Sequence, residues 1–126
     1  MKGIRVADHP LVGIWKLVSM ERIDLAGNVA EMDVVTGSLM YTSEGWMSEA
    51  LEYHAPGNDG PPSYVFYSGL YQIDGDTVIH QPRIHTNHDL VWTDLPRQYE
   101  VNGNRFTLIS RNPTGTAYIV WENVMA

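Results

Sequence analysis

Residues 64–84 contain the pattern that decides the fold: Tyr-Val-Phe-Tyr-Ser-Gly-Leu-Tyr-Gln-Ile-Asp-Gly-Asp-Thr-Val-Ile-His-Gln-Pro-Arg-Ile. Two runs rich in Val, Ile and Tyr flank the turn-forming triplet Asp74-Gly75-Asp76. Runs of this composition and length are typical of β-strands. The stretch therefore predicts an antiparallel hairpin.

The same alternation of turn residues and strand-like runs continues through all 126 residues. No window of ten or more residues has the apolar stripe of a helix, and only residues 10–13 suggest one short N-terminal helical turn. The expected strands cover residues 14–23, 29–32, 37–42, 46–53, 64–73, 77–84, 97–101, 105–110 and 116–123. Short strands joined by sequential hairpins predict an all-β fold in a single domain, residues 1–126, built as an up-and-down antiparallel β-barrel.

Composition excludes several classes of function. Eight Lys and Arg against fifteen Asp and Glu give a net charge of -7, which argues against nucleic acid or an anionic membrane surface as a partner. The chain has no Cys, so thiol nucleophiles and thiolate metal sites are excluded. No stretch reaches the roughly 18–20 apolar residues of a membrane span. Residues 1–10 lack the apolar run of a secretory signal, so we expect a cytoplasmic protein.

An ordered series of motifs resembles the small lipocalin-like domain family of the calycins. The series begins with Gly13-Ile14-Trp15 in the first strand and ends with Val120-Trp121-Glu122. Between them lie similar segments at residues 37–48, 67–71, 74–80 and 97–104. The resemblance implies a lipocalin-like barrel that holds a small ligand. The family often closes with Trp-Glu-Arg, whereas this chain has Asn123, so Arg105 or Arg111 is expected to cover Trp15 instead.

Strand alternation predicts which side chains face the interior. In the first strand, Trp15, Leu17 and Ser19 share a face. On later strands, polar residues fall among the inward apolar ones: Glu49, Tyr67, Tyr71, His80, Arg97 and Tyr99. Met47, Leu51 and Trp121 provide apolar contacts on the same faces. An apolar interior with a few placed polar groups is typical of small-molecule sites.

Each polar residue also has a purely structural interpretation. Glu49 could pair with Arg97 or point to water, and Arg97 could simply hold strands together. Tyr67 and Tyr71 could be core residues with satisfied hydroxyls. His80 could be a hydrogen-bonded core histidine.

The segment from His80 to Asp89 offers donors for a metal ion, but the spacing argues against one. His80 and His85 are an odd number of residues apart, so regular alternation points them to opposite faces. No metal and no other cofactor is expected.

Pro82 inside a strand predicts an edge or a β-bulge. We therefore expect the mouth of the pocket nearby, formed by His85, His88, Trp92 and the Pro/Gly-rich loop of residues 54–63.

Two functions remain open. The first is an isomerase, cyclase or lyase without a redox cofactor, acting on a small hydrophobic organic substrate, with catalytic residues His80, Glu49, Tyr67 and Arg97. The second is a non-catalytic carrier of a small apolar ligand. In both, the ligand-binding residues are Tyr71, Tyr99, Met47, Leu51, Trp121, His85 and Trp92. A third interpretation is an interaction role, with a homodimer formed through the strand edge at Pro82.

Overall fold

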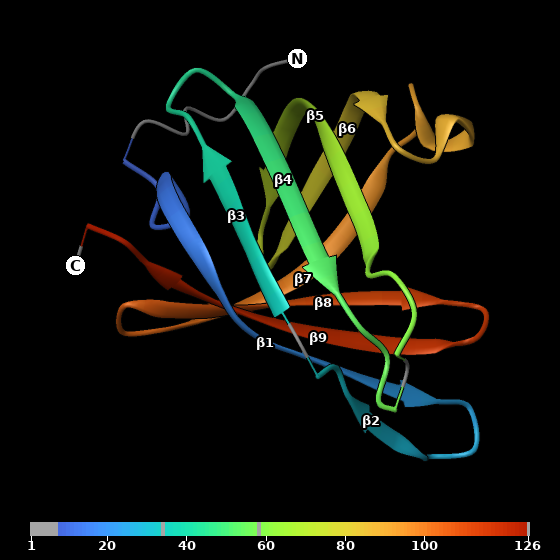
Figure 1. Ribbon diagram of the computed structural model, residues 1–126. Helices are drawn as coiled ribbons and strands as arrows, with labels where there is room; N and C mark the ends of the chain where they lie inside the picture. Colours follow the sequence, from blue (N-terminus) through green and yellow to red (C-terminus); the bar gives the residue numbers. More distant parts are fainter. Residues whose placement is uncertain (1–7, 34, 58, 126) are drawn as a thin grey trace.

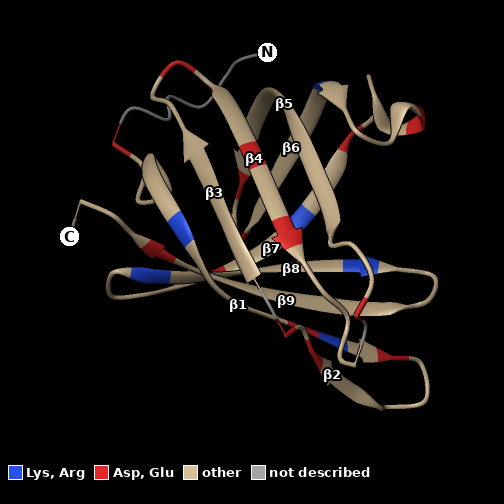
Figure 2. Ribbon diagram, in the orientation of Figure 1, with Lys and Arg blue, Asp and Glu red and all other residues tan. Residues whose placement is uncertain are grey.

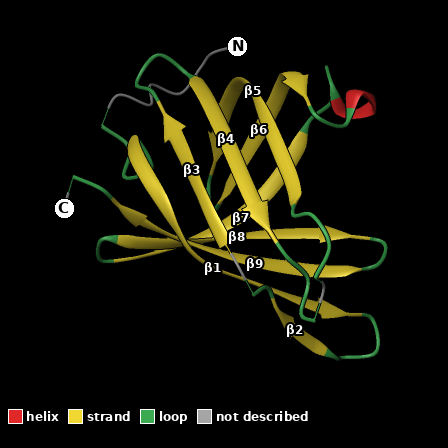
Figure 3. Cartoon of the chain, viewed as in Figure 1, coloured by secondary structure: helices red, strands yellow, loops and turns green. Residues whose placement is uncertain are grey.

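The computed structural model describes residues 8–33, 35–57 and 59–125, and the expectation for the start of the chain falls largely outside them. The described chain is strand and connecting loop apart from one short helical segment (Figure 3). The strands are β1 (Gly13–Asp24), β2 (Val29–Glu31), β3 (Val35–Tyr41), β4 (Trp46–Tyr53), β5 (Ser63–Asp74), β6 (Thr77–His85), β7 (Leu95–Asn102), β8 (Arg105–Asn112) and β9 (Gly115–Asn123). All nine expected strands are confirmed, with small shifts at their ends.

The helical segments differ in place from the expectation. No helix forms at residues 10–13: residues 9–12 form a single hydrogen-bonded turn, in which the Val12 N–H donates to the His9 carbonyl at 3.0 Å, and Gly13 already belongs to β1. The 3-10 turn η1 (His88–Leu90) instead follows β6. The Asn87 side chain accepts a hydrogen bond from the Asp89 N–H and so caps its start.

The sheet closes on itself into an up-and-down antiparallel barrel (Figure 1). Neighbouring strands follow the order β1-β3-β4-β5-β6-β7-β8-β9, and β9 pairs back with β1 from Trp15–Asn123 to Asp24–Gly115. The short strand β2 lies outside this circle and, within the described residues, pairs only with the end of β1. Closure leaves the eight strands of the barrel without a long free edge, which is the usual protection against edge-to-edge aggregation.

A β-bulge at Val18 shifts the inward face of β1. Leu17 pairs with Trp121 and Ser19 with Val120, so Val18 is the extra residue. The expectation that Ser19 shares a face with Trp15 and Leu17 is wrong, because the bulge turns Ser19 outward. Met20 and Arg22 face the interior in its place.

A second bulge, at Arg83, corrects the expected orientation of the histidines on β6. Ser68 pairs with Ile84 but Gly69 pairs with Pro82, so Arg83 has no partner on β5. The bulge expected near Pro82 is confirmed. The extra residue shifts the alternation of inward and outward side chains by one position, so His80 and His85 both face inward.

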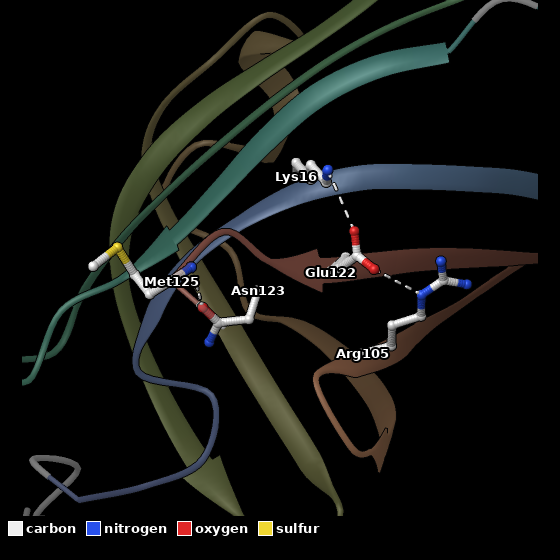
Figure 4. Close-up of polar contacts among 5 residues, drawn as sticks. All are labelled: Lys16, Arg105, Glu122, Asn123 and Met125. Atoms are coloured by element: carbon white, nitrogen blue, oxygen red, sulfur yellow. Dashed lines mark hydrogen bonds and ion pairs between the residues drawn. The ribbon is translucent and has the colours of Figure 1, made fainter.

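The end of the barrel near Trp15 is closed by apolar packing. The Trp15 ring meets Phe106 edge-on, with 4.6 Å between ring centroids, and its indole N–H donates to the Leu11 carbonyl at 3.0 Å. Arg105 and Arg111 do not cover Trp15, because Arg111 donates to Gln98 and Arg105 pairs with Glu122. Glu122 also pairs with Lys16, so one carboxylate of β9 bridges β1 and β8 on the outer face (Figure 4).

Candidate functional site

A cavity of about 440 Å³ occupies the other end of the barrel. This volume falls within the usual range of small-molecule sites, roughly 300–1,000 Å³. The ends of β1 and β4, the start of β5, the end of β6 with η1, β7, and the β8–β9 hairpin surround it. Its apolar lining comprises Met20, Leu51, Val65, Leu90, Leu108, Ala117 and Ile119. Its polar and aromatic lining comprises Arg22, Glu49, Tyr53, Tyr64, Tyr67, His85, Thr86, Asn87, Arg97 and Ser110.

A chain of hydrogen bonds leads from the cavity into the core. The Tyr67 hydroxyl lies 3.1 Å from Glu49 Oε1 and 2.6 Å from His80 Nδ1. On the far side of the same imidazole, the Tyr41 hydroxyl lies 2.5 Å from Nε2. The strand register creates this arrangement, because Glu49 pairs directly with Tyr67 and Tyr41 lies across the barrel on β3.

The three hydrogen bonds that link Glu49, Tyr67, His80 and Tyr41 can form with their donors pointing in either direction. When Glu49 is ionised, Tyr67 donates to the carboxylate, His80 Nδ1–H donates to Tyr67, and Tyr41 donates to Nε2. When Glu49 is protonated it can donate to Tyr67, which then donates to Nδ1, while Nε2–H donates to Tyr41. Glu49 can therefore gain or lose a proton while these three hydrogen bonds are kept.

The pKa values suit proton transfer at Glu49 and a neutral His80. Burial raises the pKa of Glu49 to about 7, although the Arg97 charge and the Tyr67 hydrogen bond oppose the shift. Burial, reinforced by Arg97, lowers the pKa of His80 to about 3. The two side chains are 6% and 0% exposed. Burial also raises the pKa values of Tyr41 and Tyr67 well above their ordinary range, so both remain proton donors.

The positive charge of Arg97 affects the pKa values of the groups in this chain of hydrogen bonds. Besides Glu49 and His80, its charge acts to lower the pKa values of Tyr41, Tyr67 and His85. It lies on β7 opposite Val78, facing the cavity. The ion pairs among the described residues are Lys16–Glu122 and Arg105–Glu122, so Arg97 and Glu49 are not in direct ionic contact. The alternatives in which Glu49 is ion-paired or points to water do not match this geometry.

His85 lies next to this chain of hydrogen bonds, at the wall of the cavity. Its ring stacks on Tyr67, with 4.6 Å between centroids and 8° between planes. The Asn87 N–H donates to His85 Nδ1 at 2.8 Å, so the neutral ring bears its proton on Nε2. Burial and Arg97 lower the pKa of His85. His85 thus offers a donor to a bound molecule.

The other predicted ligand residues divide by depth. Leu51 lines the cavity, whereas Met47 and Trp121 are buried in the core. Tyr71 and Tyr99 are tied to backbone carbonyls of Thr42 and Gly75, at 2.6 and 2.7 Å, near the closed end. Trp92 is 74% exposed and lies outside the cavity, with the Arg83 guanidinium 4.1 Å from its ring centroid.

The expected mouth is also only partly formed by the predicted groups. Tyr53 and Tyr64, which flank the loop of residues 54–63, line the cavity with Asn87 and Leu90. His88 is exposed on η1 and is not part of the lining.

Sequence reasoning missed several residues of the site, including Tyr41 of the hydrogen-bond chain and Arg22 of the cavity lining. The strand over residues 37–42 alternates, and Leu39 and Tyr41 are its apolar positions, so Tyr41 could have been found by applying the same test to this strand. Arg22 could not have been found in this way, because regular alternation from Trp15 points it outward and only the bulge at Val18 turns it inward.

Among the described residues, no group of three or more histidines and carboxylates is arranged to hold a metal ion. No helix in this part of the chain has the length and apolar character needed to cross a bilayer.

A search against models of known protein families finds no match, and no curated protein matches the chain at a significant level. The barrel is compatible with a lipocalin-like binding fold, and membership of that family stays a prediction.

Proposed function

We propose that this chain is a lipocalin-like barrel enzyme that acts by general acid–base chemistry, without a redox cofactor, on a small hydrophobic organic substrate. The observation that carries the proposal is a single carboxyl group, Glu49, at the wall of an apolar cavity. It is backed by the hydrogen-bond chain through Tyr67, His80 and Tyr41. A catalytic acid or base works best when its pKa lies near the working pH, and burial brings the pKa of Glu49 to about 7.

The proposed reaction begins with removal of a proton from carbon. Ionised Glu49 takes a proton from a carbon next to a carbonyl group, and the electron pair of the C–H bond moves to the carbonyl oxygen. Arg97 stabilises the resulting enolate. Return of the proton from Glu49 to a different carbon completes an isomerisation. In an elimination, the enolate electron pair instead forms a carbon–carbon double bond as the leaving group departs with its own electron pair, and Glu49 gives its proton to the leaving group or to water.

Tyr67 and His80 have supporting roles in this scheme. The Tyr67 proton is committed to the Glu49 carboxylate in the ionised state, so Tyr67 positions the base and Arg97 is left to stabilise the oxyanion. His80 does not line the cavity and both of its nitrogens are bonded to tyrosine hydroxyls, so it acts through Tyr67. Both are positioning residues, and Glu49 and Arg97 are the proposed catalytic residues.

Deuterium exchange at carbon tests the proposal without knowledge of the net reaction. Hydrophobic enones, phenols and polyketide-like acids are incubated with the protein in D₂O, and exchange at acidic C–H positions is followed by NMR. Glu49→Gln should reduce the exchange rate by roughly 10²–10⁴-fold, the usual contribution of a general base. The matched control is Glu52→Gln, on the same strand but outside this cavity, which should leave the rate unchanged. Equal exchange in wild type and Glu49→Gln would overturn the proposal.

A carrier function is the second candidate, favoured by the aliphatic lining of the cavity. In this case the buried chain only orders the core. Members of the same compound panel would then quench the fluorescence of Trp15 and Trp121 without giving exchange or any new product.

A further inference from the structure

We propose that the cavity binds an amphipathic organic anion, and that Glu49 takes up a proton when this anion binds. The inference rests on the proposed function in taking this cavity as the site, but it does not require turnover. It follows from how charge is distributed around the cavity wall.

Two arginines line the cavity although the chain has only eight Lys and Arg in all. The Lys and Arg segments are spread over several strands, among them β1, β7 and β8 (Figure 2). Arg22 of β1 and Arg97 of β7 therefore place positive charge at a cavity in a protein of net charge -7. Such a local field attracts an anion even though the molecule as a whole repels it.

Neither arginine is neutralised by a carboxylate among the described residues. Arg22 donates to the Thr114 hydroxyl at 3.1 Å, and Arg97 donates to the Pro96 carbonyl at 3.2 Å. Both acceptors are uncharged, and a guanidinium has five N–H donors. Each arginine thus retains donors for an anionic group such as a carboxylate, sulfonate or enolate. By contrast, Lys16 and Arg105 are engaged by Glu122.

The remainder of the lining defines the body of the ligand. Met20, Leu51, Val65, Leu108 and Ile119 form an apolar wall, which suits a hydrophobic ring or chain. The ligand is therefore an amphipath, with its charged end at the arginines and its apolar part against this wall.

Glu49 couples binding of the anion to uptake of a proton, because its carboxyl group lines the same cavity as the two arginines. The groups facing it are Tyr41 from β3, Tyr67 from β5, His80 and His85 from β6, and Arg97 from β7, with Arg22 of β1 also in the cavity wall. None of these is a second carboxylate. An anion close to ionised Glu49 would meet like-charge repulsion, which protonation of Glu49 removes. Reversal of the hydrogen-bond chain accommodates the added proton.

A matched pair of fluorescent probes tests the inference. Anilinonaphthalene sulfonate is an amphipathic anion that does not titrate near neutral pH, and phenylnaphthylamine is the same molecule without the sulfonate. Affinities are measured between about pH 6.5 and 8.5, at and above the ordinary histidine pKa of about 6.5. In wild type, the affinity for the sulfonate should fall about tenfold across this range, and that for the neutral probe should stay constant.

Variants separate the two parts of the inference. Glu49→Gln should bind the sulfonate with no dependence on pH. Arg97→Gln and Arg22→Gln should each weaken its binding about tenfold, the usual effect of losing a charged hydrogen-bond partner, and leave the neutral probe unaffected. The control is Arg111→Gln, an arginine outside the cavity that donates to Gln98. Retained binding of the neutral probe shows that each variant is folded.

Calorimetry in two buffers of different ionisation enthalpy counts the protons directly. Wild type should take up a fraction of a proton on binding the sulfonate near its Glu49 midpoint, rising toward one at higher pH, and Glu49→Gln should take up none. Binding of the neutral probe alone, no binding of either probe, an unchanged affinity in both arginine variants, or a pH slope that persists in Glu49→Gln would each overturn the inference. Proton-coupled binding without deuterium exchange at carbon would keep the inference and reject the proposed catalysis. Exchange without anion binding would do the reverse.

Discussion

Glu49 affects both the stability of the fold and the proposed proton transfer. Its side chain is 6% exposed, and among the described residues its one direct hydrogen-bond donor when ionised is the Tyr67 hydroxyl. Burial of a carboxylate with so little compensation is unfavourable, and this is the reason for its raised pKa. The same group that is ready to move a proton therefore weakens the fold whenever it is charged.

Replacement of Glu49 should change how stability depends on pH. The pKa of Glu49 rises from 4.5 to about 7 on folding, so the folded state holds the proton more tightly than the unfolded state. Its contribution is fully present below about pH 4.5 and is lost as the pH rises through about 7. Relative to Glu49→Gln, wild type should lose on the order of 3 kcal/mol between pH 5 and 8.5.

Urea unfolding at these two pH values measures the difference. Glu52→Gln, the outward control on the same strand, should follow wild type. Parallel pH profiles for wild type and Glu49→Gln would show that the carboxyl is not buried as described.

At the scale of the element, the hairpin of β5 and β6 depends on one glycine. Gly69 lies opposite the bulge at Arg83, where the backbone of β6 approaches closely. A Cβ at this position would lie 2.2 Å from the Gln81 carbonyl oxygen and 2.8 Å from the Arg83 nitrogen. These are backbone atoms, which cannot move aside as a side chain could.

Gly69→Ala should therefore destabilise the protein by about 3 kcal/mol, the upper part of the usual range for overpacking. Gly75→Ala is a matched control, because Gly75 has a positive φ of 62° but nothing within 4 Å of an added Cβ. It should cost only about 1 kcal/mol, the penalty of the left-handed conformation. Urea unfolding of both variants gives the comparison, and equal losses would mean that the bulge is not tightly packed.

At the scale of the whole molecule, two buried groups limit stability from opposite sides of the pH range. The pKa of His80 falls from 6.5 to about 3 on folding, so its contribution is present above about pH 6.5 and is lost as the pH falls. His9 and His85 shift in the same direction, chiefly through burial. Glu49 acts in the opposite sense, from about pH 4.5 upward.

The melting temperature should consequently be highest between about pH 4.5 and 6.5. His80→Gln should melt at a lower temperature near neutrality, because both tyrosine hydroxyls lose their partner, but its decline on the acid side should be shallower. His88→Gln, at an exposed position of η1, should follow wild type. A scan of thermal unfolding across pH provides the measurement, and an unchanged acid slope in His80→Gln would contradict the assignment.

The strands of the fold could be predicted from the sequence, whereas the positions of several site residues could not. The nine strands could be predicted because Gly and Asn mark nearly every turn, and the inward positions of Glu49, Tyr67, His80 and Arg97 follow from alternation within each strand. Alternation fails beyond a bulge, which explains the wrong face of Ser19, the missed Arg22 and the wrong expectation that His80 and His85 face opposite ways. The depth of a residue along the barrel could not be predicted either, because it depends on register between strands. For this reason Tyr71 and Tyr99 could not be distinguished from Leu51 and His85.

The two bulges have a consequence for the evolution of this barrel. A single inserted codon in a regular strand turns every later side chain to the opposite face, and so exchanges the lining of a cavity for its outer surface. At Val18 and Arg83 the sheet loops out the additional residue instead, and the later residues of both strands keep their partners. Alignment of this chain with another barrel should accordingly place one-residue gaps inside β1 and β6. An alignment that confines gaps to the loops would assign Arg22 and His85 to the outer surface.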